Sequence, residues 1–278
     1  MSTHAARVRY GPSAFGGDVR RFGALTVTLA ATEFKLRYFG SALGYLWSLA
    51  RPLLLFGVLY AVFTHVLRFG GDVKHYPIYL LSGIMLWTFF SETTGAAVRC
   101  MVDRENLVRK IRFPRMVIPL SVTLTALFNL VVNFVAVLVF VVASGIEPSV
   151  RWVELPLLVA LLAVLAAGVA MLLSVLYVRF RDVAPIWEVA QQVLFYGSPI
   201  IYVASRYPNS VERWLSASPI ATVLTQMRHA LIDPAAPTAA GEIGGWAWLA
   251  LPLGITAAVF ALGVWAFHRE APRIAENL

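Results

Sequence analysis

Apolar residues along the chain gather into six long stretches separated by short polar segments. A helix rises about 1.5 Å per residue, so roughly 20 apolar residues cross a hydrocarbon core about 30 Å thick. All six stretches reach that length, at about 43–67, 77–98, 116–144, 155–178, 184–203 and 246–267. Their continuity is typical of helices and unlike the alternating segments of a membrane barrel. The pattern therefore predicts an all-α integral membrane protein with six transmembrane helices.

Residues 1–42 precede the first stretch and carry a weaker pattern. Leu25, Leu29 and Leu36 recur near helical spacing and are flanked by basic residues. This combination predicts an amphipathic interfacial helix in the inner headgroup layer. A loosely ordered tail is the alternative, because threonines interrupt the apolar face. A cleaved leader is not expected, since the apolar run ends at Glu33 without a cleavage region.

Positive charge is concentrated on one side of this predicted topology. Six spans place both termini on the same side, and 17 of the 23 Lys and Arg residues fall in the tails, loops and span ends there. By the positive-inside rule both termini are cytoplasmic, with residues 269–278 as a C-terminal tail. The net charge of +8 then follows from topology and gives no reason to expect nucleic acid as a partner. With 59% hydrophobic and 14% charged residues, the composition is that of a membrane protein.

The largest cytoplasmic loop of this topology, residues 102–115, carries seven charges in fourteen residues. Acidic residues come first and basic residues last, the order that a helix dipole favours. Asp103 can cap the start of a helix, and Pro114 ends it. The loop therefore predicts a short helix over residues 103–113.

One face of this short helix is apolar. Leu107 and Ile111 lie four residues apart, with Val108 beside them. Such a helix can belong to a solvated positive loop, lie on anionic headgroups, or insert into a cytoplasmic partner. Asp103 and Glu105 would be repelled by anionic lipid, which favours insertion of this helix into a cytoplasmic partner. Because the segment leads directly into the third span, a push on it would move that membrane helix.

Four segments, in order, resemble the permease subunit of type-2 ABC exporters for cell-surface polysaccharides, such as O-antigen, capsule, teichoic acid and galactan. They are FKLRYFGSALGYLWSLARPLL at 34–54, ENLVRKIRFPRMVIPLS at 105–121, RFRDVAPIWEVAQQVLFYGSPIIY at 179–202 and SPIATVLTQMRHALI at 218–232. The resemblance implies a homodimer in the bacterial inner membrane that exports a lipid-linked glycan. It also implies two copies of a separate ATPase subunit, which hold ATP and Mg.

In that family the loop between the second and third spans is the coupling helix received by the ATPase subunit. The resemblance assigns this contact to Glu105, Asn106, Leu107, Arg109, Lys110, Phe113 and Arg115. The sequence separately indicates that this chain is not the motor, because a phosphate-binding loop needs glycines leading to a lysine, and the lysines here follow Phe, Val and Arg. We expect a transport subunit without its own cofactor or metal; Cys100, the one cysteine, excludes an intramolecular disulfide and a thiolate metal cluster.

Two helical stripes are candidates for the wall of a glycan conduit, because sugars present both apolar faces and hydroxyls. They comprise Phe56, Tyr60 and Phe63 in the first span, and Gln191, Phe195, Ser198 and Tyr202 in the fifth. Ordinary helix packing or an interfacial aromatic belt is the alternative for either stripe. The fifth span is the stronger candidate, because the Gly-Ser-Pro run at 197–199 should break or kink it near the outer side.

Residues 205–232 predict short helices on the outer side. Ser218 can cap a helix that has Pro219 at its first position, and the helix ends before Asp233. It is too short to span the bilayer. The resemblance implies a re-entrant gate that closes the conduit; an amphipathic helix resting on lipid is the alternative.

Polar residues inside the spans need an explanation, because each is costly in hydrocarbon. Glu92 lies well inside the second span, and Asn129 and Asn133 in the third are candidate hydrogen-bonding residues, although the sequence assigns no partner to Glu92. Arg51 in the first span can snorkel to the cytoplasmic face, or Arg51 and Arg37 can contact a lipid headgroup.

Two other classes of function compete with the ABC permease. An ion-coupled secondary transporter would use Glu92 to carry protons, but it predicts internal repeats and several intramembrane ionisable residues, whereas one clear acid is present. A membrane glycosyltransferase would need a cluster of acids or a metal site, which the sequence does not offer. Within the ABC class, export of another lipid or of a drug stays open.

Overall fold

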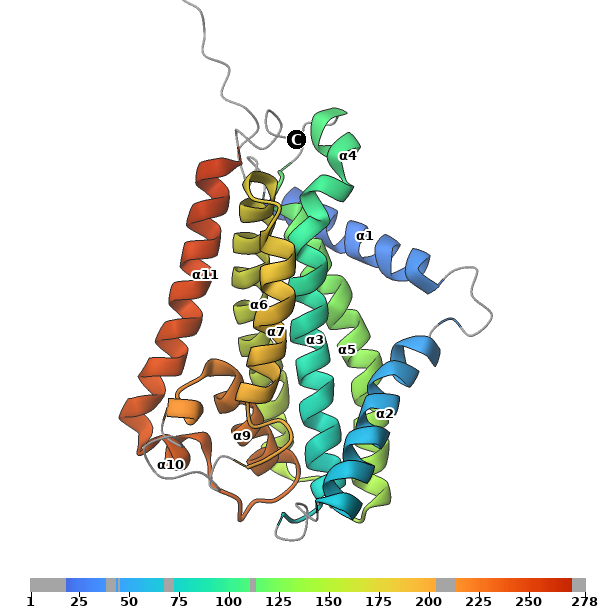
Figure 1. Cartoon of the computed structure of the whole chain (residues 1–278), viewed down its shortest axis with the longest axis vertical. Helices are drawn as coiled ribbons and strands as arrows, with labels where there is room; N and C mark the ends of the chain where they lie inside the picture. The colour runs from blue at the N-terminus through green and yellow to red at the C-terminus, as the bar shows by residue number, and fades with distance from the viewer. Residues whose placement is uncertain are drawn as a thin grey trace, which may run out of the picture.

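The computed structural model describes residues 19–38, 44, 46–67, 73–110, 114–203 and 214–271, except for the side chains of residues 109 and 110. These residues form helices and turns, and no strand occurs among them. In chain order the elements are α1 Val19–Tyr38, α2 Leu46–Ala61, the π-helical η1 Val62–Val66, α3 Tyr76–Asp103, α4 Glu105–Lys110, α5 Val117–Ala143, the 3-10 helix η2 Val150–Val153, α6 Glu154–Arg179, α7 Val183–Gly197, α9 Pro219–Leu231, α10 Ala239–Ile243, the 3-10 helix η4 Trp246–Leu249 and α11 Ala250–Glu270. The long helices run lengthwise, with α4 at one end and α9 and α10 at the other (Figure 1).

Four helical segments are long and apolar enough to cross a membrane. They are Leu46–Val66, Val117–Ala143, Val150–Arg179 and Trp246–Glu270, and they match the first, third, fourth and sixth predicted spans within a few residues. The agreement follows from long apolar runs without internal breaks. An all-helical membrane protein is therefore confirmed for these four segments.

The second and fifth predicted spans correspond to α3 and α7, which lack this combination of length and apolarity. α3 is long, but most of its residues are buried against other helices, so it needs less apolar surface. α7 has 15 residues, which gives a rise of roughly 22 Å. The predicted helix over 184–203 is wrong in its last six residues, because the chain turns extended at Ser198. Pro199 explains the end, since a residue before proline avoids the helical region, and the predicted break is confirmed.

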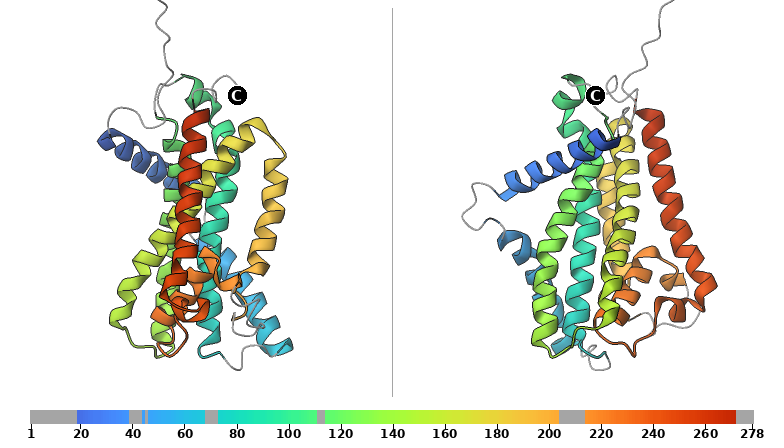
Figure 2. Two further views of the ribbon diagram at one scale, coloured as in Figure 1. Left: turned by 90° about the vertical axis from the view of Figure 1, so that its left-hand side faces the viewer. Right: turned by 180° about the vertical axis from the view of Figure 1, so that it is seen from behind.

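The core is centred on α3, which packs against α5 and α6, while α6 packs along α11. Apolar side chains of these helices and of α9 form the largest buried cluster, including Leu81, Phe89, Leu162 and Leu224. In Figure 2 α7 lies at the edge of this group of helices, and it contacts α3. The central position of α3 places Glu92 between neighbouring helices.

α1 crosses the end of the bundle at a steep angle to the long helices (Figures 1 and 2). It packs on α5 through Ala30, Phe34 and Tyr38; Ala30 is fully buried, and the Phe34 ring meets Phe128 edge-on at 5.8 Å. The predicted helix is present, but the stripe that packs on α5 is not the leucine stripe, whose placement in the headgroup layer stays a prediction. Leu36 is 66% exposed, because the stripe at positions 30, 34 and 38 turns toward α5 instead.

α4 begins at Glu105, two residues after the start of the predicted helix over 103–113, and residues 111–113 lie outside the described part. Asp103 is the last residue of α3 and does not cap α4, because Arg104 alone separates the two helices. α4 therefore continues closely from α3 and lies at the end of the bundle, near α1 (Figure 1).

α9 begins and ends where the sequence predicts, with Ser218 at the N-cap position and Pro219 next, although the Ser218 hydroxyl makes no capping hydrogen bond. Its apolar face is buried in the main cluster and includes Val223, Leu224 and Met227. The alternative of this face resting on lipid is therefore wrong. The first part of the predicted gate region, residues 205–213, lies outside the described residues.

Candidate functional site

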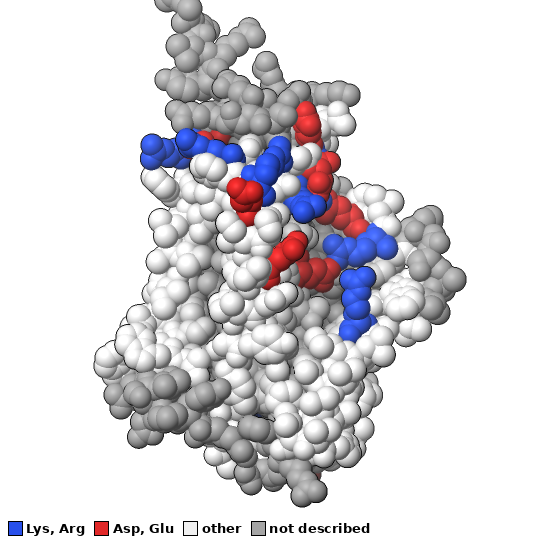
Figure 3. Space-filling view, in the orientation of Figure 1, with Lys and Arg blue, Asp and Glu red and all other residues white. Residues whose placement is uncertain are grey.

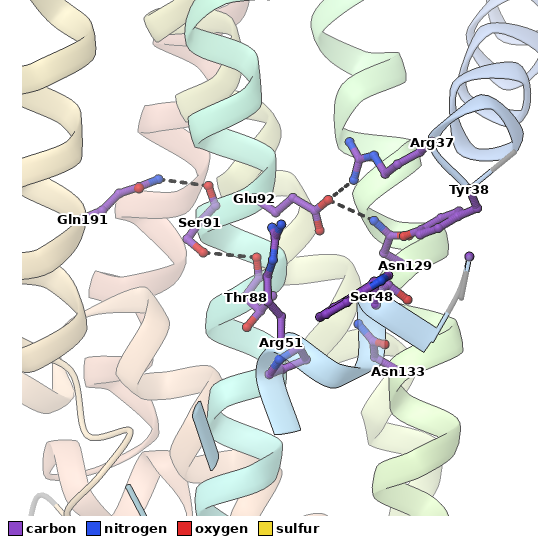
Figure 4. A pocket seen from close by; sticks show the side chains of 13 residues that line it. Arg37, Tyr38, Ser48, Arg51, Thr88, Ser91, Glu92, Asn129, Asn133 and Gln191 are labelled. Carbon is purple, nitrogen blue, oxygen red and sulfur yellow. Dashed lines mark hydrogen bonds and ion pairs between the residues drawn. The ribbon is translucent and has the colours of Figure 1, made fainter. Parts of the chain in front are cut away.

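A polar cavity of about 680 Å³ opens where α1, α2, α3, α5 and α7 meet. It brings together six residues that the sequence singled out separately: Arg37, Arg51, Glu92, Asn129, Asn133 and Gln191. Figure 4 shows their side chains arriving from different helices around one space. The cavity therefore gathers most of the charged and amide groups that the predicted spans carry.

Glu92 is held by two neighbours. Its Oε1 forms an ion pair with the Arg37 guanidinium of α1 and accepts a 2.9 Å hydrogen bond from Asn129 Nδ2 of α5. Asn129 is fixed in turn, because its Oδ1 accepts a 2.5 Å hydrogen bond from the Tyr38 hydroxyl. The acid thus joins three helices, which explains a carboxylate at this depth. Because it has a cationic partner, Glu92 needs no role as a proton carrier, and the secondary transporter loses its main argument.

A second ion pair ties α1 to the junction of α3 and α4. Arg104, the single residue between those helices, pairs with Glu33, one turn before Arg37 on α1. A smaller cavity of about 510 Å³ lies beside it and is lined by Arg99. On the α5 side, Thr125 Oγ1 donates a 3.3 Å hydrogen bond to the Ala30 carbonyl. α1 is therefore fastened along its length, and its ion pairs reach both the cavity and the start of α4.

The two predicted conduit stripes are placed differently. Phe56 and Tyr60 stack on each other at 5.7 Å and, with Phe63, pack against the main apolar cluster. Neither they nor Phe63 line the polar cavity. Packing therefore accounts for their position in the single chain, and their role in a conduit stays a prediction.

The fifth-span stripe is divided by the end of α7. Gln191 lines the cavity and donates through Nε2 to the Ser91 carbonyl at 2.9 Å and to Thr94 Oγ1 at 3.0 Å. Phe195 packs against the core, Ser198 is buried, and the Tyr202 hydroxyl donates to the Tyr196 carbonyl at 3.0 Å. The structure thus brings Gln191 alone of these four to the cavity.

The predicted coupling residues also separate into different positions. Asn106 is exposed and Leu107 half-buried on α4, whereas Val108 is 4% exposed and packs with Met101 and Met116. The apolar face predicted from Leu107, Ile111 and Val108 is therefore not offered to a partner as a whole, because Val108 anchors α4 to its own bundle; Ile111 lies outside the described residues. Glu105 opens α4; Phe113 and the side chains of Arg109 and Lys110 lie outside the described residues.

Arg115 is 5% exposed at the start of the α5 region. Its Nη1 donates to the Ala271 carbonyl, at the end of α11. This position corrects the expectation of a contact with an ATPase subunit, because the guanidinium is enclosed by its own chain. Arg115 instead braces α5 against α11.

Several cavity residues escaped sequence reasoning: Tyr38, Trp47, Ser48, Thr88 and Ser91. Thr88 carried a usable signal, because it lies one turn before Glu92 on the same face of the helix, whereas Ser91 directly precedes Glu92 and shares no face with it. Tyr38 and Trp47 offered none, since aromatic residues are frequent near membrane interfaces. Within the described residues, no group of three or more His, Cys, Asp or Glu side chains is arranged to hold a metal ion.

On the face seen in Figure 3, the described charged side chains gather in the half that carries α1 and α4, and the opposite half is almost free of them. This division agrees with a bundle embedded in lipid along much of its length. α1, α4 and the end of α11 lie at the charged end (Figure 1).

Comparison with known proteins identifies the family. The model of the ABC-2 type transporter family matches residues 24–232, so the chain belongs to that family. It is 28% identical over 267 residues to the O-antigen export system permease protein of Myxococcus xanthus, covering 94% of this chain and 98% of that protein. It is 29% identical over 210 residues to the permease of the same name from Klebsiella pneumoniae, covering 75% and 80% of the two chains. The polysialic acid transport protein of Escherichia coli is 21% identical over 202 residues, covering 72% and 78%.

Proposed function

We propose that this chain is the permease subunit of an ABC exporter that moves a lipid-linked cell-surface polysaccharide across the bacterial inner membrane. The match to an O-antigen export permease over 94% of this chain and 98% of that relative carries the proposal. A relative named for polysialic acid transport supports the same substrate class with a different glycan. This chain acts as a transport subunit, and ATP with Mg belongs to the partner.

The working assembly in this proposal is a homodimer with six spans per chain and both termini in the cytoplasm. Support for the dimer comes from α7, whose Ile186, Val189, Val193 and Tyr196 form an exposed apolar stripe at helical spacing. At roughly 22 Å, α7 is shorter than the hydrocarbon core, and a broken membrane helix is tolerated where protein covers it. A second copy beside α7 would supply that cover. The charged end of the bundle supports its cytoplasmic placement.

Two ATPase subunits would act on the two copies of α4. The burial of Val108 in one apolar cluster with Met101 of α3 and Met116 supports this coupling, because it ties α4 to the bundle. Force on Asn106 or Leu107 would then tilt the long helices instead of bending the loop. The conduit would form between the two copies, and α9 would close it on the outer side.

The test is transport by the reconstituted complex. We expect the chain to co-purify with an ATPase subunit, and we expect vesicles that contain both to move a lipid-linked polysaccharide only with ATP and Mg. Without its ATPase subunit, this chain should transport the polysaccharide neither outward nor inward. Substrate movement driven by a proton gradient without an ATPase would overturn the proposal in favour of a secondary transporter.

A further inference from the structure

The polar cavity holds one cation that pairs with no described residue. Arg51 lines the cavity from α2, and it makes no ion pair or hydrogen bond with any described residue. Arg37, the other arginine of the cavity, is already paired with Glu92. A guanidinium without a described partner has its donors free for an anionic group, and phosphate oxygens suit its planar fork.

A second group in the same cavity, the side-chain oxygen of Asn133, lacks a hydrogen-bond donor among the described residues. Asn133 is 5% exposed, and its buried Oδ1 accepts no hydrogen bond from a described residue. A buried acceptor without a donor costs free energy, so a ligand that supplies a hydroxyl would be favoured here. Phosphate alone accepts hydrogen bonds and cannot satisfy this oxygen, whereas a sugar hydroxyl can.

The remaining wall fits a sugar next to a phosphate. Trp47 and Ser48, one turn before Arg51 on α2, also line the cavity (Figure 4 labels Ser48, Arg51 and Asn133). An indole ring offers a flat apolar platform for the C–H face of a sugar. A volume of about 680 Å³ lies within the range of small-ligand sites.

We infer that this cavity binds the phosphate-linked sugar at the lipid end of the substrate, with Arg51 on the phosphate and Asn133 on a sugar hydroxyl. The inference rests on the proposed function, which supplies a glycan joined to a lipid. Glu92 opposes binding, because it adds negative charge to the cavity and retains Arg37. Arg37 is thus a second cation that becomes available when its pair with Glu92 opens.

The probe for the test is a radiolabelled dodecyl phosphoglucose, a single glucose joined to dodecanol through a phosphodiester. Binding is measured at equilibrium on the full chain in phosphatidylcholine nanodiscs. We expect Arg51→Gln to weaken binding at least tenfold and Arg51→Lys to retain most of it. Glu92→Gln should strengthen binding several-fold, a direction that misfolding cannot imitate. Arg99→Gln, which removes a charge from the neighbouring smaller cavity, is the matched control and should leave binding unchanged.

Competitors that carry only the phosphate or only the sugar test the two proposed contacts separately. Dodecyl phosphate should compete less well than the labelled probe, and Asn133→Leu should remove that difference by weakening only the sugar contact. Dodecyl glucoside, which lacks phosphate, should compete poorly. Equal competition by dodecyl glucoside would overturn the role of Arg51, and an undiminished preference for the sugar in Asn133→Leu would overturn the role of Asn133.

The source of the phosphate is tested with bilayer lipid. Replacing part of the phosphatidylcholine by phosphatidylglycerol should leave probe binding nearly unchanged; strong competition would make the occupant a bilayer lipid and overturn the inference. Wild-type affinity in Arg51→Gln, or weaker binding in Glu92→Gln, would overturn it as well. These failures differ from failure of the proposed function, which is judged by ATP-driven export by the unmodified protein.

Discussion

Gly168 of α6 and Gly263 of α11 lie backbone against backbone. A Cβ atom on Gly263 would come within 2.4 Å of the Gly168 carbonyl oxygen, and one on Gly168 would come within 2.7 Å of Phe260 Cα. Small residues let membrane helices approach this closely, and the contact packs the last long helix against the centre of the bundle. Since both neighbouring atoms are backbone, no side-chain rotation can make room.

We therefore expect Gly263→Ala to separate α6 from α11 and to destabilise the protein by roughly 1–3 kcal/mol, the usual cost of overpacking. The measurement is the temperature at which the detergent-solubilised protein loses its monodisperse elution peak. Gly254→Ala on the same helix is the control, because a Cβ there meets nothing within 4 Å. Equal stability of the two variants would show that the helices can move apart at no cost.

Tyr79 fastens the non-helical segment after α7 to α3. Its buried hydroxyl hydrogen-bonds with the Pro199 carbonyl and, at 2.7 Å, with the Tyr202 carbonyl. Tyr79→Phe removes the hydroxyl and should destabilise this segment by about 1–3 kcal/mol, because buried carbonyls lose their donor. Hydrogen exchange of residues 198–203 should become faster.

Tyr177→Phe is the control for that experiment, because the structure shows no hydrogen bond from the Tyr177 hydroxyl to a described residue. It should leave the exchange of residues 198–203 as it is in the unmodified protein. Protection that survives in Tyr79→Phe would mean that other contacts hold the segment.

Local pattern was sufficient for much of the helical architecture. α5 and α6 were predicted within a residue or two, because each is a long apolar run bounded by charged or polar residues. α9 was predicted from Ser218 and Pro219, which fix a helix start through local geometry. The end of α7 was misjudged because apolar residues continue past Pro199, and hydropathy does not register the loss of helical hydrogen bonds there.

The site was predicted as separate residues and not as an arrangement. Arg51, Glu92 and Asn133 were each singled out because charge and amides are costly in lipid, and Arg37 was singled out as a basic residue near the headgroups. The pairing of Arg37 with Glu92 joins positions 55 residues apart and depends on the angle at which α1 crosses the bundle. No periodicity records that angle, so Arg37 was assigned to lipid headgroups and Glu92 received no partner.

Cysteine labelling tests the proposed topology. Native Cys100 is buried among apolar side chains, so the unmodified protein should not react with a membrane-impermeant maleimide. Asn106→Cys on α4 should be labelled only after spheroplasts are lysed. Glu147→Cys, in the exposed loop between α5 and η2, should be labelled in intact spheroplasts. The opposite result would invert the membrane orientation and remove α4 from the reach of a cytoplasmic ATPase.

Leu107→Asp tests whether force enters through α4. Leu107 is half-buried at the charged end of the bundle, while the adjacent Val108 anchors the helix, so a carboxylate at Leu107 should disturb a partner contact more than the fold. We expect normal membrane insertion and at least tenfold less polysaccharide exported per ATP hydrolysed in reconstituted vesicles. Asn106→Asp adds the same charge at an exposed polar position and should retain most of the coupling. Export per ATP at the unmodified level in Leu107→Asp would exclude an apolar contact by α4, and equal losses in both variants would indicate that charge alone governs the contact.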